Sequence, residues 1–185
     1  MNKNKGKTSG STELKVRGML VEKGVKIPKS QNVEGISSRG YGTTENNELL
    51  LTYYEALYLL EKSMLEVEDE EGKNVDFQTL LRYYEAVNEN AWAAYLTYRD
   101  LRSRGYVVRE GFGLGVDFRV YERGEYGKDT AKYLILNIQE GKPISLEDLT
   151  RAMMQCQSLK KELVLAVINR RGEIVYYSVS QLSLK

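Results

Sequence analysis

The 185-residue sequence contains no histidine, and this absence excludes more chemistry than any single residue provides. Histidine is the only side chain whose unperturbed pKa lies close to neutral pH. A mechanism that uses an imidazole as general acid, general base or metal ligand is therefore closed to this chain acting alone.

The sequence is also poor in cysteine and has no apolar stretch near its start. Its single cysteine, Cys156, excludes an internal disulfide and a cysteine cluster for zinc, which is typical of a protein of the reducing cytoplasm. Residues 1–12 are rich in Lys, Asn, Gly and Ser, so we expect a disordered tail and not a signal peptide or membrane anchor. We therefore expect a cytoplasmic protein with no metal, no cofactor and no membrane contact.

The charge balance does not point to nucleic acid. Lys and Arg number 27 and Asp and Glu number 26, so the formal net charge is +1. Nucleic-acid binders usually carry a basic face that releases counterions from phosphates. Hydrophobic residues at 42% and charged residues at 29% are instead ordinary values for a folded globular protein.

Residues 13–87 predict a small N-terminal domain of mixed strands and helices. The evidence is the spacing of apolar residues, which alternates in strands and recurs every three or four positions in helices. Asp76 is placed to cap the second helix. The expected elements are short strands within 13–27, a loop-rich connector over 28–47, a helix over 48–63, a strand over 64–67, a solvated acidic turn over 66–71 and a helix over 77–87.

Residues 89–185 predict a second, C-terminal domain. The order helix, three strands, helix, two strands indicates a mixed sheet flanked by helices, an α/β (α+β) layout. Because residues 163–168 are all apolar, we expect that strand to be covered on both faces. The expected elements are a helix from 91 to 101, strands over 106–109, 116–122 and 132–138, a helix after Ser145, and strands over 163–168 and 173–180.

The two helices of this domain carry distinct faces. In the helix after Ser145 we expect the side chains of Leu146, Leu149, Met153 and Cys156 to point inward. In the helix from 91 the side chains of Arg99, Arg102 and Arg104 are expected to form a solvated face, not an RNA-binding patch.

Common catalytic motifs are absent from the sequence. It has no phosphate-binding glycine loop that ends in Lys-Ser/Thr and no nucleophile elbow. Gly111, Gly113 and Gly115 give the spacing G-x-G-x-G, but they lie between two expected strands and do not open a helix, which argues against a dinucleotide site. The residue patterns alone therefore show no chemistry.

Four stretches of the sequence carry a family resemblance. In the C-terminal domain they are YLTYRDLRSRGYVVREGFGLGVDFRVYERG (95–124), KYLILNI (132–138) and ISLEDLTRAMMQCQSLKKELVLAVINRRGEIVYYSVS (144–180), and in the N-terminal domain SRGYGTTENNELLLTYYEALYLLEKSMLEV (38–67). They resemble the archaeal tRNA-intron endonuclease (tRNA-splicing endonuclease) family. The resemblance implies a restriction-endonuclease-like C-terminal domain.

The resemblance also implies a metal-independent RNA cleavage by three side chains. The ribose 2′-hydroxyl attacks the adjacent phosphate, which leaves a 2′,3′-cyclic phosphate and a free 5′-hydroxyl. A tyrosine takes the 2′ proton, a histidine protonates the leaving oxygen, and a lysine stabilises the charge on the phosphate. Tyr121 and Lys161 match the tyrosine and lysine, whereas Thr130 stands where the family has its histidine. A threonine hydroxyl is far too weak an acid to replace an imidazolium.

Two further positions depart from the family pattern, one at an RNA contact and one at a subunit contact. Met154 occupies a position where the family carries an arginine that helps to hold the bulged RNA base, and Arg119, on the strand face of Tyr121 and Asp117, is the other expected RNA contact. The turn with Arg170 and Arg171 lies where the family usually has an acidic loop that docks into a neighbouring subunit.

These departures lead to a specific expectation about function. We expect a non-catalytic, structural subunit of a heteromeric archaeal tRNA-splicing endonuclease that removes introns from precursor tRNA at bulge-helix-bulge sites. By the resemblance, Val175, Tyr177 and Val179 would lie in the strand that pairs with a catalytic, histidine-bearing subunit, and two such dimers would form a heterotetramer.

Two alternatives stay open at this point. In the first, the chain is a weakly active homomeric enzyme that uses Tyr121 and Lys161 alone. In the second, it is an RNA-binding scaffold with no role in cleavage. On residue counts alone, any one of fourteen tyrosines is more often structural than functional.

Overall fold

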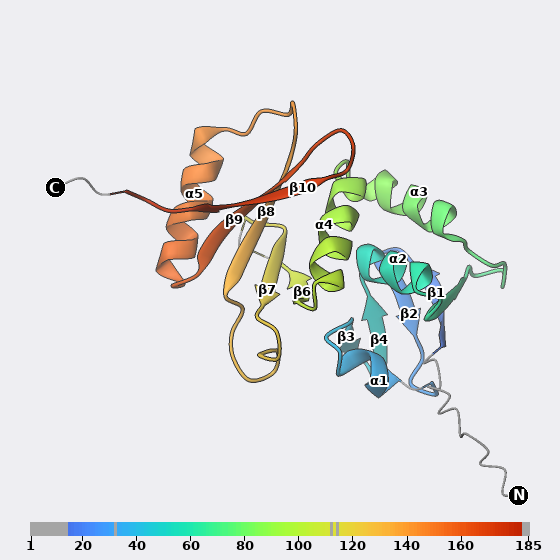
Figure 1. Ribbon diagram of the computed structural model, residues 1–185. Helices are drawn as coiled ribbons and strands as arrows, with labels where there is room; N and C mark the ends of the chain where they lie inside the picture. Colours follow the sequence, from blue (N-terminus) through green and yellow to red (C-terminus); the bar gives the residue numbers. More distant parts are fainter. Residues whose placement is uncertain (1–14, 32, 112, 114, 183–185) are drawn as a thin grey trace, which may run out of the picture.

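Two five-stranded sheets form the framework of the protein. The computed structural model describes residues 15–31, 33–111, 113 and 115–182. Figure 1 shows the sheet from the first part of the chain on the right and the sheet from the second part on the left, with helix α4 (Ala91–Ser103) between them.

The first sheet contains the two strands predicted near the start of the chain, the strand predicted over 64–67, and two others. Its strands are β1 (Val16–Val21), β2 (Gly24–Ile27), β3 (Thr43–Glu45), β4 (Glu48–Leu51) and β5 (Leu65–Glu68). Their order across the sheet is β3-β4-β2-β1-β5, and all neighbours are antiparallel except β1 and β5. The prediction of short strands within 13–27 is confirmed for β1 and β2.

Three helices accompany this sheet: α1 (Val33–Ser37), α2 (Tyr53–Glu61) and α3 (Phe77–Val87). The side chain of Asp76 accepts a hydrogen bond of 2.8 Å from the backbone N–H of Thr79, which confirms the predicted start of α3. The carboxylate of Glu55 accepts a hydrogen bond of 2.9 Å from the backbone N–H of Thr52 and so marks the start of α2.

The predicted helix over 48–63 is wrong in its first turn. Residues 48–51 form β4, in which Leu49 and Leu51 are buried and Leu50 is only half-buried, the alternation of a strand. Asn46 and Asn47 adopt left-handed backbone angles, with φ of 48° and 67°, and so turn the chain between β3 and β4. The connector predicted over 28–47 contains two short elements, α1 and β3, between its loops.

The second sheet is mixed and has a helix on each face. Its elements are β6 (Val107–Glu110), β7 (Phe118–Tyr121), β8 (Tyr133–Gln139), α5 (Leu146–Ser158), β9 (Glu162–Ile168) and β10 (Ile174–Val179). The strand order is β10-β9-β8-β7-β6, with β8 and β9 parallel and joined through α5. This confirms the predicted α+β layout.

Strand β9 is covered on both faces, as predicted. Leu163 packs with Ala152 and Cys156 of α5, whereas Ala166 and Ile168 belong to the large core on the other face, which includes α4. That core continues into the first sheet, so one apolar cluster joins both parts of the chain.

Helix α5 differs from the prediction at one position. Ser145 caps it through a hydrogen bond from the backbone N–H of Asp148, and Leu149, Met153 and Cys156 face inward. The side chain of Leu146, however, is 80% exposed. Leu146 lies in the first turn on the same side as Thr150 and Met154, four and eight positions further on, so it faces away from the sheet.

The prediction of a solvated arginine face on α4 is wrong for Arg102. Its guanidinium lies 3.9 Å from the ring centroid of Tyr41 and donates a hydrogen bond of 2.9 Å to the carbonyl of Arg39. Arg99 and Arg104 keep more of their surface in water and face Glu61 and Asp100. Arg102 thus ties α4 to the first part of the chain.

No helix among the described residues combines the length and the apolar character needed to cross a bilayer.

Candidate functional site

Tyr121 lies at the end of β7, on the face of the sheet that carries α5. Phe118 and Val120 are buried in the main core, and the alternation of the strand turns Arg119 and Tyr121 to the opposite face. The ring of Tyr121 meets the ring of Tyr126 edge-on at 5.0 Å between centroids. Arg119 and Tyr121 therefore share a face as predicted, whereas Asp117 lies before β7 and lines a pocket with Tyr54 and Tyr84 of the main core.

Asp117, just before β7, is mostly buried and points away from this end of the sheet. Its carboxylate accepts a hydrogen bond of 2.7 Å from the backbone N–H of Asn137, and burial raises the pKa of Asp117. Its contacts make it part of the support of β8 and not of the group around Tyr121.

Thr130 and Lys161 contact each other directly. The ammonium of Lys161 donates a hydrogen bond to the hydroxyl of Thr130, although the two lie 31 positions apart in the chain. Lys161 is held by its backbone N–H, which donates to the carbonyl of Cys156 at the end of α5. Thr130 is held by Asp129, whose carboxylate accepts from the backbone N–H of Thr130 at 2.6 Å.

Strand register brings Tyr121 to the same end of the sheet. Val120 of β7 pairs with Tyr133 of β8, and Tyr133 pairs with Glu162 of β9. Tyr121 follows Val120 and Lys161 precedes Glu162, so both lie at the end of the sheet where β8 begins. Among the described residues, no hydrogen bond joins Tyr121 to Thr130 or Lys161. The structure thus brings Tyr121, Thr130 and Lys161 to the same end of the sheet and joins Thr130 to Lys161 by a hydrogen bond.

A second cation at this edge was missed by the sequence reasoning. Lys132 donates a hydrogen bond of 2.7 Å to the carboxylate of Glu122, to which the Tyr133 hydroxyl also donates at 3.1 Å. The hydrogen bond with Glu122 raises the pKa of Lys132 and lowers that of Glu122. In the sequence, the one signal for Lys132 as a residue of this site was its position, two residues after Thr130 at the start of a predicted strand.

The two predicted RNA contacts lie apart from this pair. Arg119 donates a hydrogen bond of 2.8 Å from Nε to the carbonyl of Glu110 on β6. Met154 is 62% exposed on the outer side of α5, beside Leu146 and Thr150. Neither side chain contacts Thr130 or Lys161 among the described residues.

Strand β10 forms one edge of the second sheet. It pairs with β9 alone in the described part of the chain, and Val175 and Tyr177 are 52% and 53% exposed. Val179, on the same face, is half-buried against the α5 core. On the opposite face Tyr176 donates a hydrogen bond of 2.7 Å to Asp100 of α4, which fixes the strand in place.

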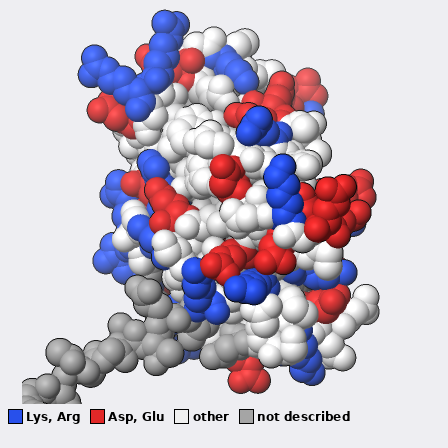
Figure 2. All heavy atoms as spheres, turned by 90° about the vertical axis from the view of Figure 1, so that its right-hand side faces the viewer, with Lys and Arg blue, Asp and Glu red and all other residues white. Residues whose placement is uncertain are grey.

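The turn before β10 presents its two arginines to solvent. Asn169 closes this turn, because its side-chain oxygen accepts hydrogen bonds from the backbone N–H groups of Arg171 and Glu173. Within the residues described, neither guanidinium is part of an ion pair. Elsewhere, on the face seen in Figure 2, basic and acidic side chains are interspersed, which agrees with the balanced composition.

Comparison with known proteins identifies the family. The model of the tRNA intron endonuclease N-terminal domain matches residues 16–81, and that of the catalytic C-terminal domain matches residues 91–176. The chain belongs to the tRNA intron endonuclease family.

Several archaeal relatives are similar over most of the chain. The tRNA-splicing endonuclease of Methanococcus vannielii is 33% identical over 165 residues, which cover 89% of this chain and 93% of the relative. That of Methanopyrus kandleri is 36% identical over 139 residues, 75% of this chain and 77% of the relative. This chain spans about half the length of the Methanococcoides burtonii tRNA-splicing endonuclease, with 34% identity over 171 residues.

Family membership confirms the resemblance inferred from the sequence. The family acts on introns of precursor tRNA. Which role this chain has within such an enzyme is a separate question, and the Thr130 and Lys161 pair bears on it.

Proposed function

We propose that this chain is the non-catalytic, structural subunit of a heteromeric tRNA-splicing endonuclease that removes introns at bulge-helix-bulge sites. The observation that carries the proposal is the hydroxyl of Thr130, which faces the ammonium of Lys161 where the resemblance places an imidazole. The subunit acts in the cytoplasm and scaffolds partner subunits that bear the histidine.

The proposal rests on the chemistry of the leaving group. When the 2′-oxygen attacks phosphorus, the bond from phosphorus to the 5′-oxygen breaks, and that oxygen needs a proton. Tyr121 fits the base that takes the 2′ proton and Lys161 fits the cation that stabilises the phosphate, but Thr130 has no acidic proton to deliver at neutral pH. Loss of one general acid typically lowers the rate by about 10²–10⁴.

The edge of β10 supports assembly with a partner. An edge strand offers unpaired backbone groups, and the exposed side chains of Val175 and Tyr177 give it an apolar face. In the proposal, β10 pairs with the corresponding strand of a catalytic subunit, and two such dimers form a heterotetramer that binds precursor tRNA.

A weakly active homomeric enzyme is the second candidate. It is favoured by the position of Tyr121 at the same sheet edge as Lys161, which keeps two of the three chemical groups in place. In that case the pure protein would leave cyclic-phosphate ends on a bulge-helix-bulge RNA, at a low rate.

Reconstitution separates the two. The chain and a histidine-bearing family member are purified separately and together, and each sample is incubated with the same precursor tRNA. The proposal predicts cleavage by the mixture and none by this chain alone. Cyclic-phosphate products from this chain alone would favour the homomeric enzyme, and failure of the two proteins to co-purify would refute the structural role.

A further inference from the structure

A groove of about 520 Å³ lies where helix α4 meets the first part of the chain. We call it the Trp92 groove, after the single tryptophan of the sequence, which lines it. Leu65 and Val75 are buried and Asp76 is exposed, so the groove has an apolar floor and a charged rim. The lining residues are Leu60, Glu61, Leu65, Glu66, Asn74, Val75, Asp76, Phe77, Trp92, Tyr95 and Arg99.

The ring of Trp92 is the free aromatic surface of this groove. Trp92 is 46% exposed, and its ring centroid lies 5.6 Å from that of Tyr95. The ring of Tyr95 is already covered, because the guanidinium of Arg99 lies 5.7 Å from its centroid and Phe77 packs against it edge-on. Among the described residues, no cation lies over the ring of Trp92. Since tryptophan is the aromatic side chain that attracts cations most strongly, this ring suits a guanidinium.

The three carboxylates of the groove differ in their partners. Glu61 lies 3.6 Å from the guanidinium of Arg99, and Glu66 is paired with two basic side chains at the beginning of β1. The carboxylate of Asp76 accepts hydrogen bonds from Thr79, which lower its pKa, but no cation in the described part of the chain forms an ion pair with it. The groove thus places an unpaired negative charge beside an exposed indole.

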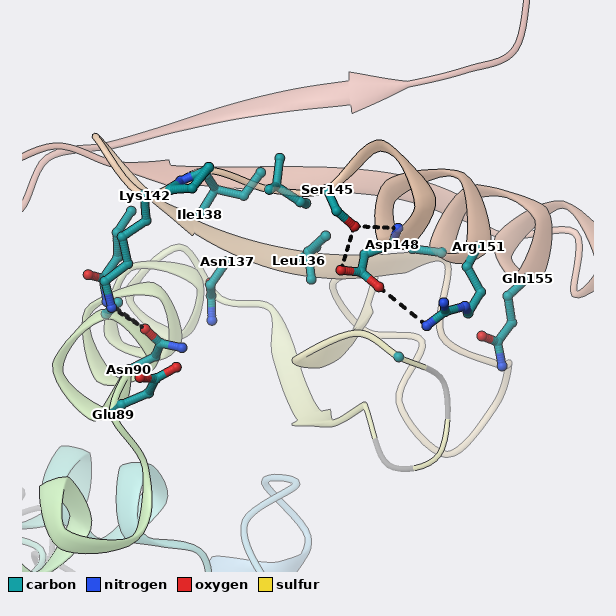
Figure 3. A pocket seen from close by; sticks show the side chains of 16 residues that line it. Glu89, Asn90, Leu136, Asn137, Ile138, Lys142, Ser145, Asp148, Arg151 and Gln155 are labelled. Atoms are coloured by element: carbon teal, nitrogen blue, oxygen red, sulfur yellow. Dashed lines mark hydrogen bonds and ion pairs between the residues drawn. The ribbon is translucent and has the colours of Figure 1, made fainter.

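The pocket in Figure 3, between β8, α4 and α5, lacks this combination. No aromatic side chain belongs to its described lining. The ammonium of Lys142 donates to the side-chain oxygen of Asn90 at 3.0 Å, and Arg151 donates to the carboxylate of Asp148 at 3.3 Å. Of the two pockets, the Trp92 groove is therefore the one suited to a cationic side chain.

The turn between β9 and β10 carries the matching cations. Arg170 and Arg171 are exposed, and neither guanidinium forms an ion pair within the described residues. The side-chain oxygen of Asn169 accepts from the backbone N–H groups of Arg171 and Glu173, and Gly172 adopts a left-handed φ of 79°. Because the backbone of the turn is already fixed, little entropy is lost when a partner binds it.

This turn and the Trp92 groove are neighbours on the surface. A Cβ on Gly172 would lie 3.2 Å from Cδ1 of Leu96, which follows Trp92 by one turn of α4, and Figure 1 shows the β9–β10 turn beside that helix. A two-fold contact between identical chains brings each feature of one copy to its complement on the other. Two complementary features that lie side by side can therefore both be satisfied about one two-fold axis.

We propose that the Trp92 groove binds the turn with Arg170 and Arg171 of a second copy of this chain, and that the second copy returns the contact. One guanidinium stacks on the indole of Trp92 and pairs with the carboxylate of Asp76. Within the proposed heterotetramer this contact would join the two dimers. It does not rest on that function, because the pure chain is sufficient to form it.

The fluorescence of Trp92 tests the contact, since no other tryptophan contributes to the signal. The pure full chain is diluted in steps, and quenching of Trp92 by acrylamide, which is neutral, is measured at each concentration. The proposal predicts that Trp92 is protected at high protein concentration and becomes accessible on dilution. Equal quenching at every concentration would overturn it. Protection that does not depend on concentration but needs the two arginines would show that the turn reaches its own groove, which also overturns the contact between copies.

Variants of both partners of the contact give its strength. Replacing both turn arginines, Arg170→Ala with Arg171→Ala, should raise the dissociation constant from this titration roughly 10-fold or more. Asp76→Asn, which keeps a good cap for α3 but removes the charge, should raise it about 2- to 5-fold. Arg151→Ala, at an exposed arginine of α5, is the matched control and should dissociate as the parent does. Parent-like dissociation constants in both test variants would overturn the proposal.

Tyr177→Arg separates this contact from pairing through β10. The substitution changes the exposed face of β10, so protection of Trp92 in the pure chain should persist. Loss of that protection in Tyr177→Arg would assign the association to β10 and refute the Trp92 groove. Failure to bind a histidine-bearing family member, with protection of Trp92 intact, would count against the proposed function and support this contact as a separate one.

Discussion

The ammonium of Lys161 donates a hydrogen bond to the hydroxyl of Thr130, across 31 residues of sequence. The pair joins the loop before β8 to the turn between α5 and β9. Both groups therefore lie at the sheet edge where β7 ends at Tyr121. In the proposed structural subunit this edge keeps its cation and its phenol but has no acid for a leaving oxygen.

If the edge is vestigial, Tyr121→Phe and Lys161→Ala should leave cleavage by the reconstituted heteromer within about 3-fold of the parent. The reason is that the partner's own triad would perform the chemistry. The measurement is the single-turnover rate on precursor tRNA. A loss of about 10²-fold or more in either variant would show that these groups still act, which the homomeric enzyme requires.

Assembly should depend on the exposed face of β10. Tyr177→Arg should weaken pairing with a partner strand, because it places a charge in an apolar contact, while the stability of the chain itself stays the same. Light scattering coupled to size-exclusion chromatography reports the mass of the complex. Tyr83→Arg on α3, where the side chain is 47% exposed, is the control and should assemble normally. Intact complexes with Tyr177→Arg would argue against β10 as the interface.

A buried ion pair between Arg109 and Glu55 joins the two parts of the chain, and its effect on the free energy of unfolding depends on pH. Arg109 lies 3.1 Å from the carboxylate of Glu55, which also accepts from the backbone N–H of Gly42. Burial raises the pKa of Glu55, and Arg109 counteracts this shift. Arg109→Met should therefore lower the free energy of unfolding by about 3–5 kcal/mol at pH 7, because it leaves a buried charge without its partner.

The pH dependence of this variant follows from the sign of the shift. A raised pKa means that the folded state favours protonated Glu55, so stability is gained below the unfolded value of 4.5 and lost as pH rises through the folded value. The cost of Arg109→Met should therefore shrink at pH 4, where Glu55 is more often neutral. Urea unfolding at both pH values measures it, and an equal cost at the two would contradict this account.

Close backbone contact at Gly24 should make it intolerant of any side chain. A Cβ there would lie 2.0 Å from the carbonyl oxygen of Leu51, so Gly24→Ala should cost about 3 kcal/mol or more, since strand β2 or β4 must move. Gly72 also has a positive φ, of 77°, but no atom within 4 Å of such a Cβ. Gly72→Ala should cost only about 1–2 kcal/mol. Similar unfolding midpoints for the two variants would refute the steric explanation.

Local sequence signals predicted most elements but not their ends. The predicted helix of α2 included residues 48–51 because Leu50 lies three positions before Tyr53, a spacing that fits a helix as well as the alternation of β4 fits a strand. Only pairing with β2 and β3 decides between the two, and that information is not local. Leu146 was predicted to face inward because it lies three positions before Leu149, but in the helix it lies on the outer side with Thr150 and Met154.

The candidate site, too, was predictable from the sequence only in part. The identities of Tyr121, Thr130 and Lys161 were read from the family resemblance, and strand register then brought them to one edge. The ion pair of Lys132 with Glu122 follows from a tertiary contact that no spacing rule contains.

The missing proton donor is tested most directly by changing the leaving group. Thr130→His and the parent chain, each without a partner, are compared on a bulge-helix-bulge RNA and on the same RNA with sulfur in place of the bridging 5′-oxygen. A thiolate leaves without prior protonation, because its conjugate acid has a pKa of about 8.5. The account predicts that Thr130→His cuts the oxygen substrate about 10²–10⁴-fold faster than the parent and that this advantage nearly disappears with sulfur. Equal rates for the two proteins on the oxygen substrate would contradict it.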